Sequence, residues 1–310
     1  MSFSQTVLRP LTLRVAEHPW SRKLATGTRP GRAVASRFVA GETLEQAMRV
    51  AAELDRRRVT AMLDLLGENV RTRAQAGSAC TAYLAALEAI GGAPSLDCAI
   101  SLKLTQLGLD MSVDECLDNV APILEAAERI GCVVMIDMES VGYVDPTLRV
   151  AGEAHAVYAK VGVALQAYLR RTERDVERLP PGMRIRLVKG AYLEPPEVVF
   201  TSKRQVDVNY ARLFTTLLAR GHAIDVATHD PRLLDGVRRR VDDAGGGWSR
   251  VEYQMLYGVR RDLQVRFAGQ GYPVRVYVPY GTEWYPYLTR RLAERPANVW
   301  FFLSNLVRPR

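Results

Sequence analysis

The chain has 310 residues and a formal net charge of +8, and 48% of its residues are hydrophobic. A chain of this length can bury one barrel-sized core or two smaller ones, and the composition is that of an ordinary globular protein. No apolar run reaches the ~20 residues of a transmembrane helix, and no apolar stretch with a small-residue cleavage site opens the chain. We therefore expect neither a membrane span nor a secretory signal.

The cysteines and histidines argue against metal and disulfide chemistry. The four cysteines lie 16 to 18 residues apart without a Cys-x-x-Cys pair, and the four histidines show no paired-ligand spacing. This pattern is typical of a reduced protein without a zinc site. We expect a cytoplasmic protein and no metal.

Residues 1–35 are predicted to form a basic arm, since residues 1–40 hold seven Arg or Lys against the single acid Glu17. Such an arm attracts anionic membrane surfaces or nucleic acid. Few aromatic residues are present to stack on bases, so we expect no nucleic-acid partner. A peripheral contact with the inner face of the membrane is left open.

A helical lead-in is predicted for residues 36–96. Thr43 is suited to be an N-cap, Gln46 follows three residues later, and apolar positions then recur at helical spacing. A second helix is predicted at about 59–66 and a third at about 71–89, each ended by glycine.

After residue 96 short apolar runs alternate with longer helix-like segments. The eight strand candidates are Cys98–Leu104, Cys132–Met138, Val161–Gln166, Arg184–Val188, Ala223–Thr228, Val251–Met255, Val274–Val278 and Val299–Leu303. The helix-like segments include Val113–Ile130, Thr147–Tyr158, Ala167–Glu177, Val206–Ala219 and Pro231–Asp243. Such alternation indicates βαβ units, and eight of them predict an α/β fold with a (β/α)8 barrel over residues 97–310. An open doubly wound sheet would carry a Gly-rich dinucleotide turn, and none follows these strands.

A barrel brings the carboxyl ends of its strands around one mouth, where active sites lie. We expect a strongly cationic, anion-binding pocket there, with Asp137 as the one well-placed acid. The expected cations are Lys103, Arg186, Lys189, Arg290 and Arg291.

Residues 279–295 add a face of interest just before the last strand candidate. On a helix Tyr287, Arg290, Arg291 and Glu294 lie along one side, and two guanidiniums beside a phenol suit a carboxylate or phosphate. By itself the pattern is more typical of a solvated face with an ion pair between Arg290 and Glu294.

Several motifs together resemble the proline dehydrogenase family. They are Ser-Leu-Lys-Leu at 101–104, Ile-Asp-Met-Glu at 136–139, Arg-Leu-Val-Lys-Gly-Ala-Tyr at 186–192, Ala-Thr-His at 227–229 and Tyr-Leu-Thr-Arg-Arg-Leu-Ala-Glu at 287–294. The resemblance covers about residues 36–307. It implies a distorted (β/α)8 (TIM-like) barrel that binds FAD non-covalently. It also implies oxidation of L-proline to Δ1-pyrroline-5-carboxylate, the first step of proline catabolism, with electrons passed to a membrane quinone.

The resemblance also implies site residues. Asp137 and Arg186 match active-site members, with the Arg186 guanidinium near the flavin N5. The substrate-binding residues it implies are Lys103, Tyr277, Tyr287, Arg290 and Arg291. The FAD contacts it implies are Met138, Gln166, Arg186, Lys189, Gly190, Ala191, Thr228 and His229. Leu193 departs from the pattern, because some members carry a tryptophan there against the adenine.

Two other functions compete with this interpretation. Lysines at barrel strand ends, here Lys103 and Lys189, can act as Schiff-base nucleophiles in an aldolase. A basic module that binds nucleic acid or an anionic membrane would need no catalysis. The sequence leaves open the oligomeric state, the electron acceptor and whether Asp137 orients its neighbours or moves a proton.

Overall fold

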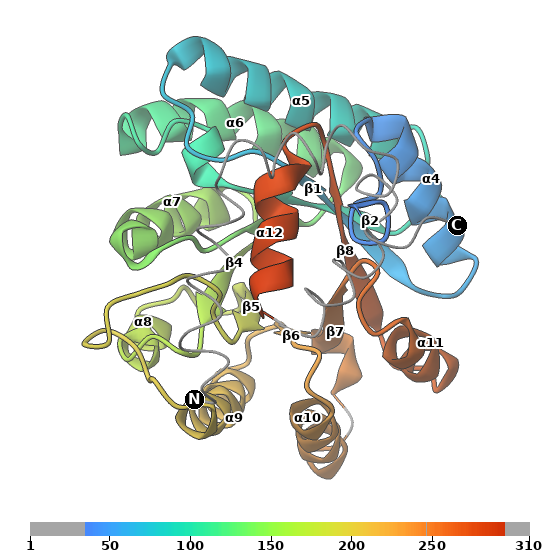
Figure 1. The fold of residues 1–310 in the computed structure, drawn as a ribbon, viewed down its shortest axis with the longest axis vertical. Helices are drawn as coiled ribbons and strands as arrows, with labels where there is room; N and C mark the ends of the chain where they lie inside the picture. The colour runs from blue at the N-terminus through green and yellow to red at the C-terminus, as the bar shows by residue number, and fades with distance from the viewer. Residues whose placement is uncertain (1–34, 246, 295–310) are drawn as a thin grey trace, which may run out of the picture.

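The computed structural model describes residues 35–245 and 247–294, with side chains up to residue 289. In this part of the chain eight parallel strands pair in sequence order and close into a barrel (Figure 1). The strands are β1 Thr60–Leu65, β2 Cys98–Leu102, β3 Val134–Ile136, β4 Val161–Gln166, β5 Arg184–Val188, β6 Ile224–Ala227, β7 Val251–Leu256 and β8 Val274–Tyr280. The predicted (β/α)8 fold is confirmed.

Helices surround the barrel or precede it. They are α4 Leu44–Asp55, α5 Arg73–Gly91, α6 Val113–Ile130, α7 Val144–Val157, α8 Thr172–Glu177, α9 Lys203–Ala219, α10 Pro231–Asp243, α11 Arg261–Gly269 and α12 Trp284–Glu294, with short 3-10 turns η2 Leu104–Gln106, η3 Val141–Tyr143 and η4 Trp248–Arg250. The predicted capping box of α4 is present, because Thr43 Oγ1 accepts from the Gln46 N–H at 3.4 Å and Gln46 Oε1 accepts from the Thr43 N–H at 3.1 Å. No helix in these described ranges is long and apolar enough to cross a membrane.

The helix predicted at 59–66 is wrong, because these residues form β1. The run Thr-Ala-Met-Leu-Asp-Leu is short and buried on both faces, and periodicity does not separate such a run from a buried helix. β1 pairs with β2 on one side and with β8 on the other. The barrel therefore begins at Thr60 rather than at residue 97, and α4 alone leads into it. The last strand candidate, 299–303, lies outside the described residues.

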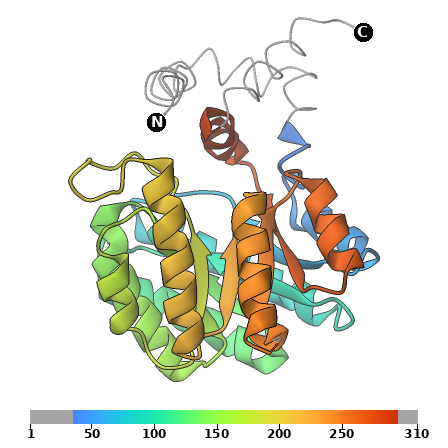
Figure 2. The same ribbon diagram turned by 90° about the horizontal axis from the view of Figure 1, so that it is seen from below.

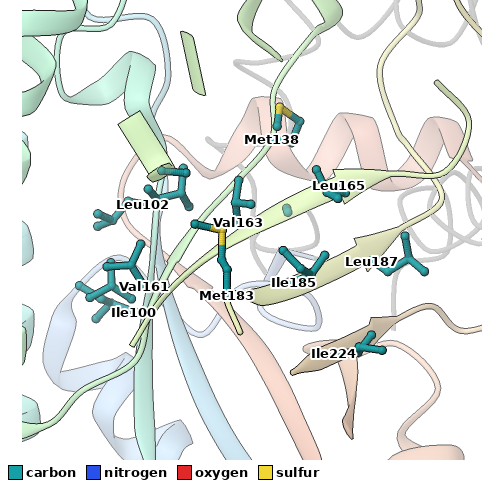
Figure 3. Close-up of a cluster of buried hydrophobic side chains, with 14 of the residues drawn as sticks. Ile100, Leu102, Met138, Val161, Val163, Leu165, Met183, Ile185, Leu187 and Ile224 are labelled. Carbon is teal, nitrogen blue, oxygen red and sulfur yellow. The ribbon is translucent and has the colours of Figure 1, made fainter. Parts of the chain in front are cut away.

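Apolar side chains that point outward from the strands pack against the helices. Figure 3 shows part of this core, with labelled side chains from β2, β4, β5 and β6, from Met138 two residues after β3 and from Met183 just before β5. Each fully buried Leu, Ile or Val contributes about 1.5–3 kcal/mol of transfer free energy. The residues between them on the same strands point inward, and many of these are polar. The apolar core thus surrounds a polar barrel interior.

Ion pairs fill the amino-terminal end of the barrel interior. Arg275 on β8 contacts Glu252 on β7 at 2.9 Å and Asp97, just before β2, at 3.1 Å. Arg184 on β5 contacts Asp225 on β6 at 3.1 Å. These pairs lie at the end opposite the expected mouth.

Helix α12 lies across the carboxyl-terminal mouth of the barrel (Figure 1), and the view in Figure 2 shows it above the strands. It follows β8 through Gly281, whose φ of +125° is a conformation that glycine adopts readily. Its residues Trp284, Tyr287 and Leu288 are buried in one apolar cluster with the segment before α4 and with Leu66 after β1. The chain that enters the barrel therefore fixes the helix that covers it.

Candidate active site

Inward-facing residues near the carboxyl ends of the strands form one buried polar cluster, hereafter the mouth cluster. Six of the eight strands or the residues directly after them contribute to it. Its members are Asp64 (β1), Ser101 and Lys103 (β2 and its end), Asp137 (after β3), Arg186 (β5), Gln254 (β7) and Tyr277 (β8). Side chains of period two on parallel strands converge in this way at the axis of a barrel.

Asp137 is the acceptor at the centre of the mouth cluster. Its Oδ1 accepts from Arg186 and from Ser101 Oγ at 2.9 Å, and its Oδ2 accepts from Tyr277 OH at 2.6 Å and Lys103 Nζ at 3.3 Å. Burial alone would raise the pKa of Asp137, but the charges of Lys103 and Arg186 outweigh burial and lower it. The carboxylate therefore stays ionised with its acceptor sites in use.

Lys103 uses three donors in the same cluster. Its ammonium contacts Asp64 Oδ1, Asp137 Oδ2 and Tyr277 OH, the last at 3.1 Å. Burial opposes the charge of Lys103, but the carboxylates of Asp64 and Asp137 reverse this effect, and the pKa is raised well above its usual value. An ammonium has three N–H groups, so each donor of Lys103 has a partner before any substrate arrives.

Arg186 is fixed in place from several sides. Its Nε donates to Gln254 Oε1 at 2.8 Å, and its Nη1 donates to both Ser101 and Asp137. The guanidinium also lies 5.1 Å from the ring centroid of Tyr277. Gln254 is oriented in turn, because its Nε2 donates to Glu252 at 2.8 Å. Hydrogen bonds from two of its nitrogens therefore fix the orientation of this planar cation.

The described residues of the mouth are not strongly cationic, and the side chains of Arg290 and Arg291, which belong to the expected cationic pocket, lie outside the described residues. Lys103 and Arg186 are balanced by Asp137 and by a second acid, Asp64, which the sequence analysis missed. The prediction that Asp137 is the one well-placed acid is therefore wrong. At the rim Lys189 is also paired, with Asp207 at 2.6 Å and Asp230 at 2.9 Å.

Four of the predicted substrate or catalytic residues meet in the mouth cluster. Lys103, Asp137, Arg186 and Tyr277 converge as expected. Tyr287 is buried in the apolar cluster of α12. Arg290, Arg291 and Glu294 belong to α12 by their backbone, but their side chains lie outside the described residues.

Gln166, at the end of β4, has an unpaired side-chain acceptor among the described residues. Its Nε2 donates to the carbonyl of Glu139 at 3.1 Å, while its buried Oε1 has no hydrogen-bond partner among the described residues. The Met138 side chain lies in the apolar core (Figure 3), and only its carbonyl approaches Gln166, at 3.5 Å.

The remaining predicted cofactor residues follow β5 and β6. Gly190 has a φ of +113°, and a Cβ there would lie 2.1 Å from the Tyr168 ring, so a larger residue is strained. The half-buried backbone of Ala191 follows it. Thr228 Oγ1 accepts from the Asp230 N–H at 3.2 Å, and His229 Nε2 accepts from the Leu256 N–H at 3.0 Å. Accepting this bond leaves the proton of a neutral His229 on Nδ1.

Glu139, for which the sequence suggested no role, is buried beside Gln166. Its carboxylate accepts from the Thr105 hydroxyl at 2.7 Å, and burial raises its pKa to about 7. Ser101 and Gln254 were likewise visible in the sequence near strand ends without a function. Their signal was only an inward position on a strand, which many structural residues share.

Comparison with known proteins decides the family. The proline dehydrogenase family model matches residues 47–303. The chain belongs to the proline dehydrogenase family. It is 39% identical to a proline dehydrogenase of Deinococcus radiodurans over 310 residues, which cover 97% of this chain and 98% of that protein. It is 38% identical to proline dehydrogenase 1 of Bacillus subtilis subsp. natto over 307 residues, 97% of this chain and 100% of the relative.

Solved structures of this family share the fold. The crystal structure of proline utilization A from Bdellovibrio bacteriovorus, inactivated by N-propargylglycine, superposes with a TM-score of 0.79 at 25% identity. That match covers 85% of this chain and 33% of the larger protein.

Proposed function

We propose that this chain oxidises L-proline to Δ1-pyrroline-5-carboxylate, the first step of proline catabolism, with FAD as the electron acceptor. The proposal rests on membership of the proline dehydrogenase family. The structural observation that carries it is the mouth cluster, where Lys103, Asp137, Arg186 and Tyr277 hold fixed charges at the end of the barrel that carries catalysis. Such fixed charges suit the orientation of a small zwitterion.

The orphaned acceptor of Gln166 supports a bound flavin. A buried acceptor without a donor costs about 1–3 kcal/mol, and the ring N–H of a flavin is a donor that would remove this cost. FAD, when bound, supplies the two-electron acceptor that side chains lack. The residues proposed to hold it are Met138, Gln166, Arg186, Lys189, Gly190, Ala191, Thr228 and His229.

The proline carboxylate requires cations beyond those already paired in the mouth cluster. Because Lys103 has used its donors, a carboxylate must replace one of its partners, and the contact to Asp137 at 3.3 Å is the longest. We propose that Arg290 and Arg291 supply the main clamp, since α12 carries them across the mouth. Tyr277 and Tyr287 are proposed to line the ring of the substrate.

Asp137 is proposed to orient its neighbours rather than to accept the proton of the substrate nitrogen. A carboxylate has about four acceptor positions, and those of Asp137 take up Arg186, Ser101, Tyr277 and Lys103. Its lowered pKa also makes it a poor base. Proline must lose a proton from nitrogen before its C–H electrons leave, and on this proposal water at the mouth takes that proton.

The aldolase alternative is disfavoured by the same contacts. A Schiff-base lysine attacks as a neutral amine, whereas the carboxylates around Lys103 raise its pKa. Lys189 is paired with Asp207 and Asp230. Neither lysine is prepared as a nucleophile.

We further propose a membrane quinone as the electron acceptor, reached by peripheral contact. Residues 1–34 contribute six Lys or Arg and one Glu, and residues 295–310 contribute three Arg and no acid, so the whole excess charge lies in these two segments. Ala35, where the first segment joins, is buried against α12 at the mouth. Basic residues attract anionic lipid, and the position of Ala35 supports a membrane on the side of the mouth.

A visible spectrum of the purified protein tests the central proposal. We expect flavin absorbance, and anaerobic L-proline should bleach it. D-proline is the matched control, because inversion at the carbon that bears the carboxylate moves the ring, and with it the reacting CH2, when the carboxylate is held in the same place. Protein that stays colourless after incubation with FAD, or that L-proline does not bleach, would contradict the proposal.

A further inference from the structure

The packing around Asp64 does not by itself require an acidic side chain. Asp64 lies one residue from the end of β1, in register with Ser101 on β2 and Pro279 on β8, and its side chain is fully buried. Its Oδ1 accepts from Lys103, while its buried Oδ2 has no partner among the described residues. An apolar residue of similar size avoids this cost of burying a charge. The acid therefore points to a role in the site.

Asp64 and Asp137 hold the Lys103 ammonium from two sides. Without Asp64, the ammonium would move fully onto Asp137 and compete with Arg186 and Tyr277 for its oxygens. With Asp64 in place, Lys103 can release Asp137 when a carboxylate arrives and still keep one charged partner. Burial raises the pKa of Asp64, and the ammonium of Lys103 opposes this effect, so the charge of each group depends on the other.

We infer that Asp64 is a positioning residue, which holds Lys103 charged and in place to receive the carboxylate of the substrate. The inference rests on the proposed function and adds a residue to its site. Asp64 itself does not touch the substrate on this arrangement, because its bonded partner is Lys103. Its effect on catalysis passes through that lysine.

The surroundings of Lys103 make this role measurable by pH. Burial lowers its pKa, and Asp64 is the largest of the influences that raise it. The other titratable or charged groups that act on Lys103 are Asp137, Tyr277, Arg186, Tyr83 and Glu139. Burial raises the pKa of Glu139 to about 7, and this group titrates in the parent as well as in the variants. Burial raises the pKa of both tyrosines well above the usual value. Once Asp64 loses its charge, the largest influence that raises the pKa of Lys103 is gone, and this pKa falls.

The test compares Asp64→Asn with Asp225→Asn in the FAD-loaded enzyme. Asp225 is the matched control, because it is also an inward, fully buried aspartate with one unpartnered oxygen, but it pairs with Arg184 at the opposite end of the barrel. Asp64→Asn should lower kcat/KM for L-proline about 10- to 100-fold, the loss expected for a charged hydrogen bond. It should also add a falling alkaline limb below the usual pKa of lysine.

Asp225→Asn should add no falling alkaline limb, because the charged partner of Asp225 is Arg184 and not Lys103. Burial raises the pKa of Asp225 to about 7, so the comparison uses the profile above that pH. A second readout does not depend on turnover: calorimetric binding of cyclopentanecarboxylate, a non-oxidisable acid of the same ring size. Its affinity should weaken with rising pH in Asp64→Asn but not in the parent or in Asp225→Asn. Parental pH profiles for both kcat/KM and binding in Asp64→Asn would overturn the inference.

A second comparison tests the inference if Asp64→Asn does not fold. Lys103→Met leaves Asp64 as an unpaired buried charge, so adding Asp64→Asn to it should raise the melting temperature and leave kcat/KM unchanged. A further fall in kcat/KM would show that Asp64 acts independently of Lys103, against the inference. The parent enzyme separates the two proposals, because failure of L-proline to bleach the parent refutes the function, whereas the Asp64 variants are judged only against a parent that turns over.

Discussion

Replacing Tyr277 by Phe removes one oxygen from the mouth cluster with almost no change of volume. The phenol donates to Asp137 at 2.6 Å and accepts from Lys103 at 3.1 Å. Each hydrogen bond to a charged group contributes about 1.5–3 kcal/mol. Because Asp137 and Lys103 also contact each other and can close part of the gap, we expect a net loss of about 2–3 kcal/mol in the free energy of unfolding.

The same substitution should lower catalysis, since Lys103 and Asp137 are drawn directly together when the phenol is absent. We expect kcat/KM for L-proline to fall about 30- to 100-fold, with FAD content unchanged, because 1.4 kcal/mol corresponds to tenfold. Urea unfolding of the apoprotein and steady-state kinetics of the FAD-loaded enzyme measure the two effects.

Tyr253→Phe is the matched control for this prediction. Tyr253 is also a fully buried tyrosine, but it points outward from β7 and donates to the neutral carbonyl of Leu234 at 3.2 Å. Its loss should cost about 1 kcal/mol of stability and leave kcat/KM intact. If Tyr277→Phe behaves like Tyr253→Phe in both assays, the mouth cluster does not have the energetic role assigned to it.

Three further predictions address the cofactor, the substrate and pH. Arg291→Met should lose turnover with L-proline while the visible spectrum still reports bound FAD; wild-type kinetics would refute the carboxylate clamp. Gln166→Leu should leave the apoprotein as stable or more stable, because it removes an unsatisfied acceptor, and should weaken FAD binding about 10-fold in a fluorescence titration. Unchanged FAD affinity would separate Gln166 from the cofactor site. Burial raises the pKa of Glu139 to about 7. Between the usual glutamate pKa and pH 7 the folded state therefore binds more protons than the unfolded state. The free energy of unfolding falls by up to about 3 kcal/mol as pH rises through this range. Glu139→Gln should therefore gain stability over the parent from pH 5 to pH 8 in thermal melts, and a pH-independent difference would contradict the assignment.

The sequence predicted most of the barrel because its strands are separated by long, strongly periodic helices. Val161–Gln166 and Arg184–Val188 form strands with the predicted bounds, as Val113–Ile130 and Pro231–Asp243 form helices. The six residues of β1 were misassigned because an apolar run of that length fits one helical turn and a half as well as a buried strand. The error moved the start of the barrel and removed Asp64 from the candidate residues.

The site was predictable where a residue type and a strand end coincide. Lys103, Asp137 and Arg186 could be assigned to one mouth because all parallel strands end there. Their charge balance could not, because the partner of Lys103 comes from β1 and the partners of Lys189 come from α9 and the residue before α10. Pairing between distant segments depends on barrel geometry, which local sequence does not contain.

The contacts inside the barrel also connect its two ends. Arg186 at the mouth bonds Gln254, Gln254 bonds Glu252, and Glu252 pairs with Arg275 near the opposite end. Barrels of this class commonly divide into one face for chemistry and another for stability, which lets sequence vary on one without effect on the other. Here one chain of hydrogen bonds and ion pairs runs along the barrel axis. A substitution such as Arg275→Leu therefore alters the support of the Arg186 guanidinium in the active site. Evolution and engineering of this barrel therefore have to treat Glu252 and Arg275 at its floor as part of the support of Arg186 at its mouth.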